Sequence, residues 1–189
     1  MAVARAAREL IADARPILIC SGTGFNGGDG LAAARHLHAW GSTPRVVLMG
    51  PRAQLRDEPA VYADILERLG CALMDWTDRE GSSMASEAMN ECGVIIDALL
   101  GIGARGPVRA PMAALIDQMN RSGKPIVAVD LPSGSDGDTG AVQGMAVRAT
   151  VTVALGLAKH GCVRGEGPAH VGALRVDPIM FPPHVLASS

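Results

Sequence analysis

The sequence of 189 residues predicts an α/β fold in which helices cover both faces of a mostly parallel sheet. Short apolar runs of strand length alternate with longer segments that have the periodicity of amphipathic helices. The composition is 48% hydrophobic but only 3% aromatic, so the core must consist mainly of small and aliphatic side chains. The length suits one domain, and we expect residues 1–189 to form it.

The expected elements follow one another along the whole chain. Residues 2–13 carry apolar side chains on one helical face, and Pro16 ends this helix. The expected strands cover 17–20, 43–49, 71–74, 94–101, 126–130, 150–155 and 173–176. The other expected helices cover 30–40, 53–69, 83–91 and 111–120, with Gly41 after the first of these and Pro111 in the first turn of the last. Residues 77–81 read as a polar linker.

Charge and cysteine usage exclude several classes of protein. A net charge of −2 provides no broad basic field, which disfavours nucleic acid as a partner. No apolar run approaches the ~18 residues of a membrane span, and the charged first helix is unlike a secretory signal, so we expect a cytoplasmic protein without membrane contact. The 4 cysteines are far apart and are expected to be buried, reduced thiols. The 5 histidines show no zinc-site spacing.

The segment 21–30, Ser-Gly-Thr-Gly-Phe-Asn-Gly-Gly-Asp-Gly, joins the first strand to a helix and is typical of a ligand cradle. Its Gly-x-Gly-x-x-Gly spacing matches the dinucleotide fingerprint, but the second strand lacks the acidic residue expected about 20 residues further on. A P-loop is excluded because Gly28-Asp29 stands where Lys and Ser/Thr are required. Asp29 could either cap the helix or face a ligand.

Polar residues follow four of the expected strands. They are Asn26 with Asp29, Asp97, Asp130 with Ser133, and Lys159. Because the carboxyl ends of parallel strands lie at one edge of a sheet, these side chains can converge on one pocket.

Asp97 interrupts an apolar run, so its burial must be compensated by hydrogen bonds or by a cation. One carboxylate among neutral oxygens suits a monovalent hard cation, which would leave Asp130 free as an acid or base. Alternatively, both carboxylates could simply accept hydrogen bonds from backbone amides at the strand ends.

Three motifs together resemble the YjeF N-terminal domain family, the NAD(P)HX epimerases. They are residues 24–31 with 33–37, residues 97–101 with 107–109, and residues 129–134 with 138–140. The resemblance covers nearly the whole chain in order. It implies a Rossmann-like three-layer αβα sandwich and an isomerase that interconverts the R and S epimers of hydrated NADH and NADPH in metabolite repair.

By position, the resemblance implies one potassium ion per subunit, with Asn26, Asp97 and Ser133 as its ligands. The implied substrate contacts are Phe25, Asn26, Gly27, Gly28, Asp29, Gly101, Ile102, Gly103, Ala104, Arg105, Gly106, Pro107 and Asp130. Our mechanistic hypothesis makes Asp130 the catalytic group that moves a proton to or from the ring hydroxyl. We also expect a homodimer, and a dehydratase on a separate chain as functional partner.

The sequence departs from the family pattern in two places. Phe25 stands where the family usually has a second Asn, and the sequence begins without the additional N-terminal segment that helps cover the site and pair subunits. The main alternative is a non-catalytic nucleotide-binding or dimerising scaffold, but such relatives have lost the motif acids that this chain retains. A third possibility is an NADP-dependent dehydrogenase that uses Arg52 for the 2′-phosphate. The sequence shows no site for the hydride acceptor that this activity requires. Lys159 could meet a phosphate or a carboxamide, or be a solvated loop residue.

Overall fold

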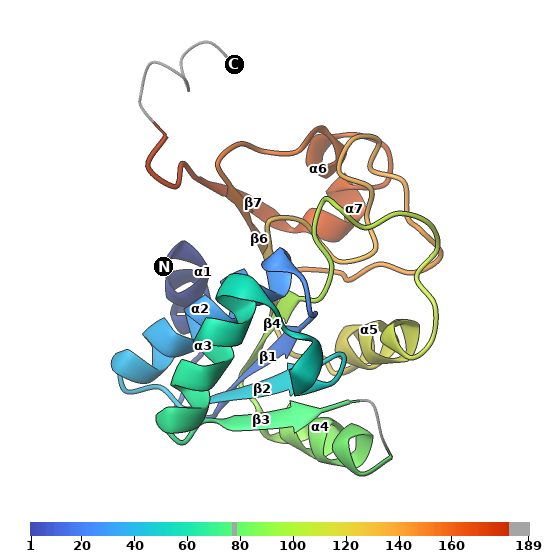
Figure 1. The fold of residues 1–189 in the computed structure, drawn as a ribbon. Helices are drawn as coiled ribbons and strands as arrows, with labels where there is room; N and C mark the ends of the chain where they lie inside the picture. Colours follow the sequence, from blue (N-terminus) through green and yellow to red (C-terminus); the bar gives the residue numbers. More distant parts are fainter. Residues whose placement is uncertain (77–78, 182–189) are drawn as a thin grey trace.

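The computed structural model describes residues 1–76 and 79–181, which contain a seven-stranded sheet with the order β3-β2-β1-β4-β5-β6-β7 (Figure 1). The strands are β1 (Ile17–Ser21), β2 (Pro44–Leu48), β3 (Ala72–Asp75), β4 (Val94–Ala98), β5 (Ile126–Val129), β6 (Val151–Leu155) and β7 (Ala173–Asp177). All neighbouring strands pair in parallel, so the expected parallel sheet is confirmed.

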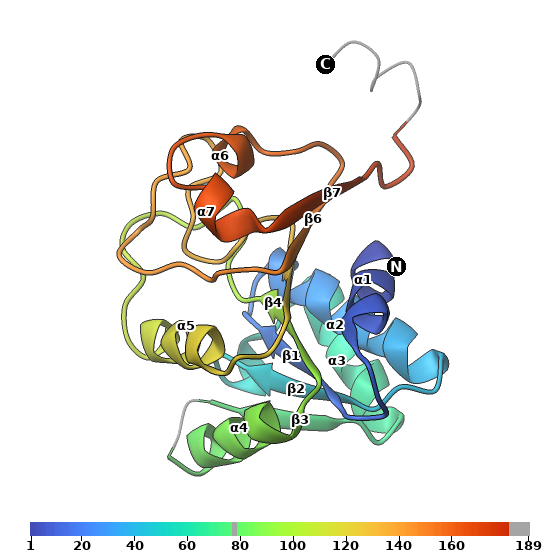
Figure 2. The ribbon, with the colours of Figure 1, turned by 180° about the vertical axis from the view of Figure 1, so that it is seen from behind.

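Helices cover both faces of the sheet, which gives the three layers expected from the sequence. One layer holds α1 (Ala2–Leu10), α2 (Phe25–Ala39) and α3 (Asp57–Arg68), and the opposite layer holds α4 (Arg79–Glu91) and α5 (Met112–Arg121) (Figures 1 and 2). A 3₁₀ turn, η1 (Arg52–Gln54), precedes α3, and two single-turn helices, α6 (His160–Val163) and α7 (Pro168–Val171), lie between β6 and β7. Neither described segment contains a helix long and apolar enough to span a bilayer.

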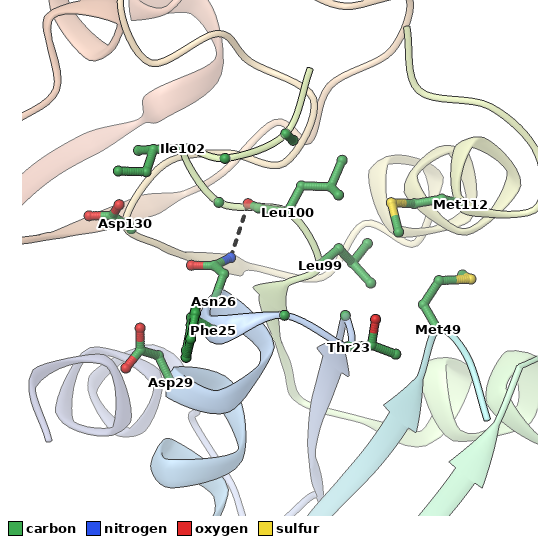
Figure 3. Close-up of a pocket in the computed structure, with 15 residues that line it drawn as sticks. Thr23, Phe25, Asn26, Asp29, Met49, Leu99, Leu100, Ile102, Met112 and Asp130 are labelled. Carbon is green, nitrogen blue, oxygen red and sulfur yellow. Dashed lines mark hydrogen bonds between the residues drawn. The ribbon is translucent and has the colours of Figure 1, made fainter. Parts of the chain in front are cut away.

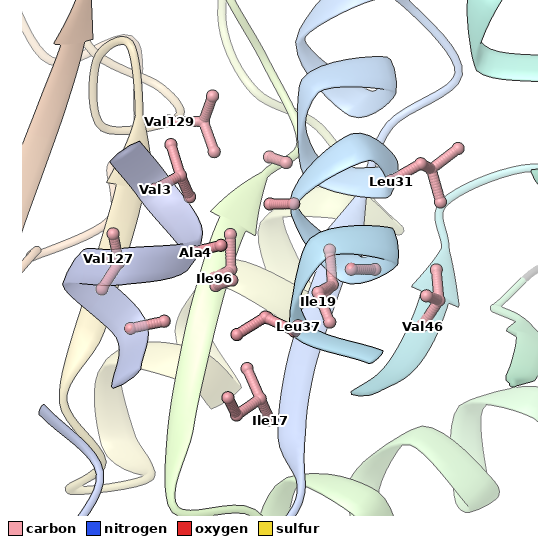
Figure 4. Packing of buried hydrophobic residues seen from close by; sticks show 14 of the residues in the cluster. Val3, Ala4, Ile17, Ile19, Leu31, Leu37, Val46, Ile96, Val127 and Val129 are labelled. Atoms are coloured by element: carbon pink, nitrogen blue, oxygen red, sulfur yellow. The ribbon is translucent and has the colours of Figure 1, made fainter. Parts of the chain in front are cut away.

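The central strand β1 is buried along its whole length because both of its faces are covered. Ile17 and Ile19 pack toward α2, as Figure 4 shows, whereas Leu18 and Cys20 belong to the core under α4 and α5. This alternation follows from the two-residue period of a strand. All cysteines are free and three of the four are buried, as the sequence predicted; Cys71 is half-buried.

The largest difference from the expected elements is the start of α2, which begins at Phe25 and not at residue 30. Glycines make this possible by letting the first turns pack closely. A Cβ on Gly27 would lie 1.9 Å from the carbonyl oxygen of Gly22, and one on Gly30 would lie 2.4 Å from the Cβ of Ala98. Residues 25–30, more than half of the predicted loop, are therefore the beginning of a helix.

Other boundaries shift by smaller amounts. The first helix ends at Leu10, and Pro111 is the N-cap of α5 instead of lying within its first turn. The strand expected over 94–101 ends at Ala98, so its last residues belong to a loop. The helix α4 begins at Arg79, inside the linker expected over 77–81, whose first two residues lie outside the described part.

Candidate active site

A cavity of about 530 Å³ opens at the carboxyl ends of β1 and β4. The chain runs from β1 to β2 on one side and returns to β4 on the other, so this is the switch point at which ligands bind in open parallel sheets. The start of α2, the loop after β4, Met49, Met112 and Asp130 line the cavity (Figure 3). The segments that were predicted separately thus meet in one place.

The expected substrate contacts divide between the cavity and its surroundings. Those that line the cavity are Phe25, Asn26, Asp29, Gly101, Ile102, Gly103, Ala104 and Asp130. Arg105, Gly106 and Pro107 line an adjoining cavity, and Gly27 and Gly28 are buried in α2. Sequence reasoning did not name the lining residues Met49 and Met112, which belong to no motif, nor Thr23, Leu99 and Leu100, which lie inside the motifs but were not among the expected contacts.

Asp130 follows β5 and is held in place by contacts to the end of β6. Its backbone amide donates to the carbonyl of Val153 over 2.9 Å, and its Oδ1 accepts from the amide of Leu155 over 3.0 Å. The same oxygen forms an ion pair with Lys159. Within the described residues the other oxygen, Oδ2, has no hydrogen-bond partner. Asp130 lines the cavity, and its carboxylate is fixed through one oxygen while the other is not engaged.

Lys159 is neither a solvated residue nor a free cation waiting for a phosphate. Its ammonium group donates to the carbonyl of Leu155 over 2.8 Å in addition to pairing with Asp130. The side chains of Lys159 and Asp130 are only 18% and 13% exposed, respectively. Sequence reasoning had placed Lys159 at the same edge of the sheet, but its partner depends on β5 and β6 being neighbours.

Asp29 lies in the second turn of α2, so it does not cap this helix. Its side chain remains accessible at the cavity wall. Partial burial, and then the negative charge of Asp130, raise the pKa of Asp29 above its ordinary value. Phe25 is 73% exposed at the rim and carries no polar group to replace the Asn of the family pattern. The cavity therefore brings two carboxylates into electrostatic contact beside an exposed aromatic ring.

Asp97 is fully buried at the end of β4. Its Oδ1 accepts from the hydroxyl of Ser133 over 2.6 Å, and its Oδ2 accepts from the backbone amide of Ser133 over 2.8 Å. The amide of Leu99 also donates to Oδ1. Burial raises the pKa of Asp97 to about 6, although the hydrogen bonds from Ser133 and Leu99 lower it. The hydrogen-bonding role considered for Asp97 is thus observed, but no cationic side chain of the described chain neutralises its charge.

The backbone of Leu100 links the three residues expected to bind a cation. The side-chain Nδ2 of Asn26 donates to the Leu100 carbonyl over 3.0 Å, and the backbone amide of Leu100 donates to the Ser133 hydroxyl over 2.9 Å. Ser133 in turn contacts Asp97. Carboxylate, hydroxyl and carbonyl oxygens therefore lie together, and the side chain of Asn26 meets them through its amide nitrogen. No group of three His, Cys, Asp or Glu side chains gathers anywhere in the described residues, so this part offers no zinc-type cluster.

The first turn of α2 adds an electropositive feature to the cavity. Its N-cap is Gly24, and no side chain caps the helix. The first amide groups of a helix have no partner within the helix, and together with the helix dipole they attract anions. Gly24, Phe25 and Asn26 line the cavity, so this helix end faces the ligand space.

Fold and site together define a three-layer α/β protein with a small-molecule cleft at its switch point and a fixed carboxylate inside. Residues 1–161 match the family model described as YjeF-related protein N-terminus. The chain belongs to this family.

Named relatives and a solved structure agree with this family assignment. The chain is 44% identical to a bifunctional NAD(P)H-hydrate repair enzyme Nnr of Pyrobaculum aerophilum, with 96% of this chain and 36% of that protein covered. It is 38% identical to an NAD(P)H-hydrate epimerase of Limosilactobacillus fermentum, with 86% of this chain and 74% of that protein covered. The crystal structure of the yeast protein YNL200c superposes with a TM-score of 0.79 at 25% identity, covering 95% of this chain and 76% of that one. The chain thus spans about a third of the bifunctional relative.

Proposed function

We propose that this chain is an NAD(P)H-hydrate epimerase, an isomerase that interconverts the R and S epimers of hydrated NADH and NADPH. The observation that carries the proposal is the carboxylate of Asp130, which lines a nucleotide-sized cleft and is held by Lys159 and Leu155 through one oxygen while the other has no hydrogen-bond partner among the described residues. The printed names of the relatives, which include NAD(P)H-hydrate epimerase, support the choice of substrate.

Epimerisation requires that a hydroxyl leave the hydrated ring carbon and return on the other face. When the carbon–oxygen bond breaks, its electron pair leaves with oxygen, which takes up a proton, and the ring nitrogen donates its lone pair to the planar carbon. Addition of water to the opposite face reverses these steps and returns the proton. The free oxygen of Asp130 is suited to give and accept this proton.

Lys159 stabilises the carboxylate charge between proton transfers and fixes its orientation. The uncapped start of α2 is suited to bind the substrate phosphates in the same cleft. A bound substrate would thus be held at its phosphates while its ring lies against Asp130.

The site also suits a potassium ion, because a buried carboxylate without a cationic partner lies among neutral oxygens. We infer that Asn26, Asp97 and Ser133 would hold it, together with the Leu100 carbonyl that already contacts two of them. The ion would supply positive charge that offsets Asp97 and orders the loop after β4.

The reaction is tested by a chromatographic time course of purified S-NADHX converting to the R epimer, in potassium chloride and in choline chloride. We expect equilibration faster than the spontaneous background, and a loss of at least about 100-fold in Asp130→Asn. Asn tolerates the positive φ of 69° at this position, so the variant should fold. Wild-type protein that gives no acceleration in either salt would favour the non-catalytic nucleotide-binding module, and full turnover by Asp130→Asn would remove the assigned role of this residue.

The homodimer, the cytoplasmic location and the dehydratase on a separate chain stay predictions from the sequence. Sedimentation equilibrium over a range of protein concentrations tests the dimer directly.

A further inference from the structure

The candidate active site continues into a second cavity of about 450 Å³. The two cavities share Met49, Leu100, Ala104 and Met112, so they form one cleft. Figure 3 shows Asp130 at one side of this cleft and Met49 with Met112 at the other. The cleft therefore runs from the end of β5, past the start of α2, to the carboxyl end of β2 and the beginning of α5.

The second cavity differs chemically from the first. Its walls are mainly apolar, with Met49, Leu100, Val108, Pro111 and Met112 among the lining residues. An apolar slot with thioether and proline walls suits a flat heteroaromatic base.

Two arginines, Arg105 and Arg109, also line this cavity and are exposed. Arg105 donates to the backbone carbonyls of Ile102 and Ala104 over 3.0 and 3.2 Å, which partly fixes it. The guanidinium of Arg109 makes no hydrogen bond or ion pair with any other described residue.

Arg52, which was considered for a 2′-phosphate on sequence grounds, is already occupied. It pairs with Asp64 and Glu67 and donates to the carbonyl of Ala60. A guanidinium engaged by two carboxylates is a poor phosphate ligand, whereas a free one at a cavity wall can bind phosphate through two parallel hydrogen bonds.

We propose that the second cavity binds the adenosine end of the substrate and that Arg109 binds its ribose 2′-phosphate, so that the site prefers NADPHX to NADHX. The inference rests on the proposed function, because it takes the Asp130 end of the cleft as the place of the hydrated ring. The order of features along the cleft then matches a dinucleotide: ring at Asp130, phosphates at the start of α2, and base between Met49 and Pro111.

Calorimetric binding of adenosine 2′,5′-bisphosphate and of ADP tests the subsite without using the reaction. Both probes carry adenosine and two phosphate groups, but only the first has a 2′-phosphate. We expect the wild type to bind adenosine 2′,5′-bisphosphate about tenfold more tightly, and Arg109→Leu to lose this advantage. Arg109→Lys should retain part of it. Arg148→Leu, which removes an exposed arginine outside both cavities, is the matched control and should retain all of it.

Epimerisation kinetics give the second readout. The ratio of kcat/KM for NADPHX to that for NADHX should be about ten in the wild type and fall to about one in Arg109→Leu, mainly through KM for NADPHX. Equal affinity of the wild type for the two probes, or a preference that persists in Arg109→Leu, would overturn the inference even if both hydrates are epimerised. A probe preference that depends on Arg109 in a protein without epimerase activity would support the subsite and reject the proposed reaction.

Discussion

Asp130 adopts a backbone conformation that residues other than glycine rarely adopt, with a φ of 69°. Such conformations cost on the order of 1–3 kcal/mol and persist where surrounding contacts fix them. Here the contacts are the hydrogen bonds from Leu155 and Lys159 to the side chain and the bond from the Asp130 amide to Val153. The strain and the fixed carboxylate occur at the same residue, which favours a functional explanation.

Replacing Lys159 by Met should lower both activity and stability. The change leaves a mostly buried carboxylate without its cation, which costs about 3 kcal/mol, the lower end for buried pairs because both side chains retain some contact with water. We expect turnover to fall at least about tenfold, measured by the epimerisation time course beside urea unfolding. Lys124→Met removes the other lysine of the chain, which donates to the Asn90 carbonyl on the surface, and should leave turnover unchanged. Wild-type turnover in Lys159→Met would show that Asp130 acts without this partner.

The raised pKa of Asp97 should make the free energy of unfolding depend on pH in potassium-free solution. Its pKa is raised from 3.8 to about 6 in the folded protein, so the folded state binds its proton more tightly than the unfolded chain. This contribution to stability is fully present below pH 4 and is lost as the pH rises through about 6, and a rise in pKa of this size corresponds to roughly 3 kcal/mol. Asp97→Asn should therefore flatten the decline in the free energy of unfolding between pH 4 and pH 7, measured by urea titration. An unchanged slope in the variant would mean that other groups cause the decline.

At the scale of elements, the contact between α2 and β4 depends on glycine. A Cβ on Gly30 would lie 2.4 Å from the Cβ of Ala98 and 3.3 Å from the Cγ2 of Ile19. We expect Gly30→Ala to destabilise the protein by about 1–2 kcal/mol, because overpacking costs more than the ~1 kcal/mol gained in helix propensity. Gly103→Ala is the control for urea unfolding, since its new Cβ would meet open space. Equal midpoints for both variants would show that α2 can move away from β4 at no cost.

The elements also show what the sequence could and could not predict. All seven strands were expected because each is a short, mainly apolar segment bounded by polar or glycine-rich residues. The start of α2 was missed because the glycines that usually break helices here permit close packing against a distant strand. Helices α6 and α7 were also missed, since one turn is too short to show a helical period.

At the scale of the whole molecule, strand order decides which residues meet. Alternating strands and helices predicted a parallel sheet, but not that β1 lies beside β4 or that β5 lies beside β6. The first neighbour relation brings Asn26 to the Leu100 carbonyl, 74 positions away, and the second brings Lys159 to Asp130, 29 positions away. The candidate residues were therefore readable from the sequence as a set at one sheet edge, whereas their pairing required the fold.

The proposed cation site should couple the whole fold to potassium in a pH-dependent way. A ligand that binds only the folded state at 100 times its Kd adds about 2.7 kcal/mol, which corresponds to a Tm increase of roughly 5–10 °C for a domain of this size. We expect potassium chloride to raise the Tm at pH 8 relative to choline chloride of equal ionic strength. At pH 5 the effect should largely disappear, because Asp97, with a pKa of about 6, is then mostly protonated and neutral.

Asp97→Asn should lose the potassium effect at pH 8, whereas Asp138→Asn, which removes an exposed turn carboxylate, should keep it. An equal Tm in the two salts at pH 8 would reject the potassium site but leave the acid–base role of Asp130 intact, because that role rests on separate contacts with Lys159 and Leu155.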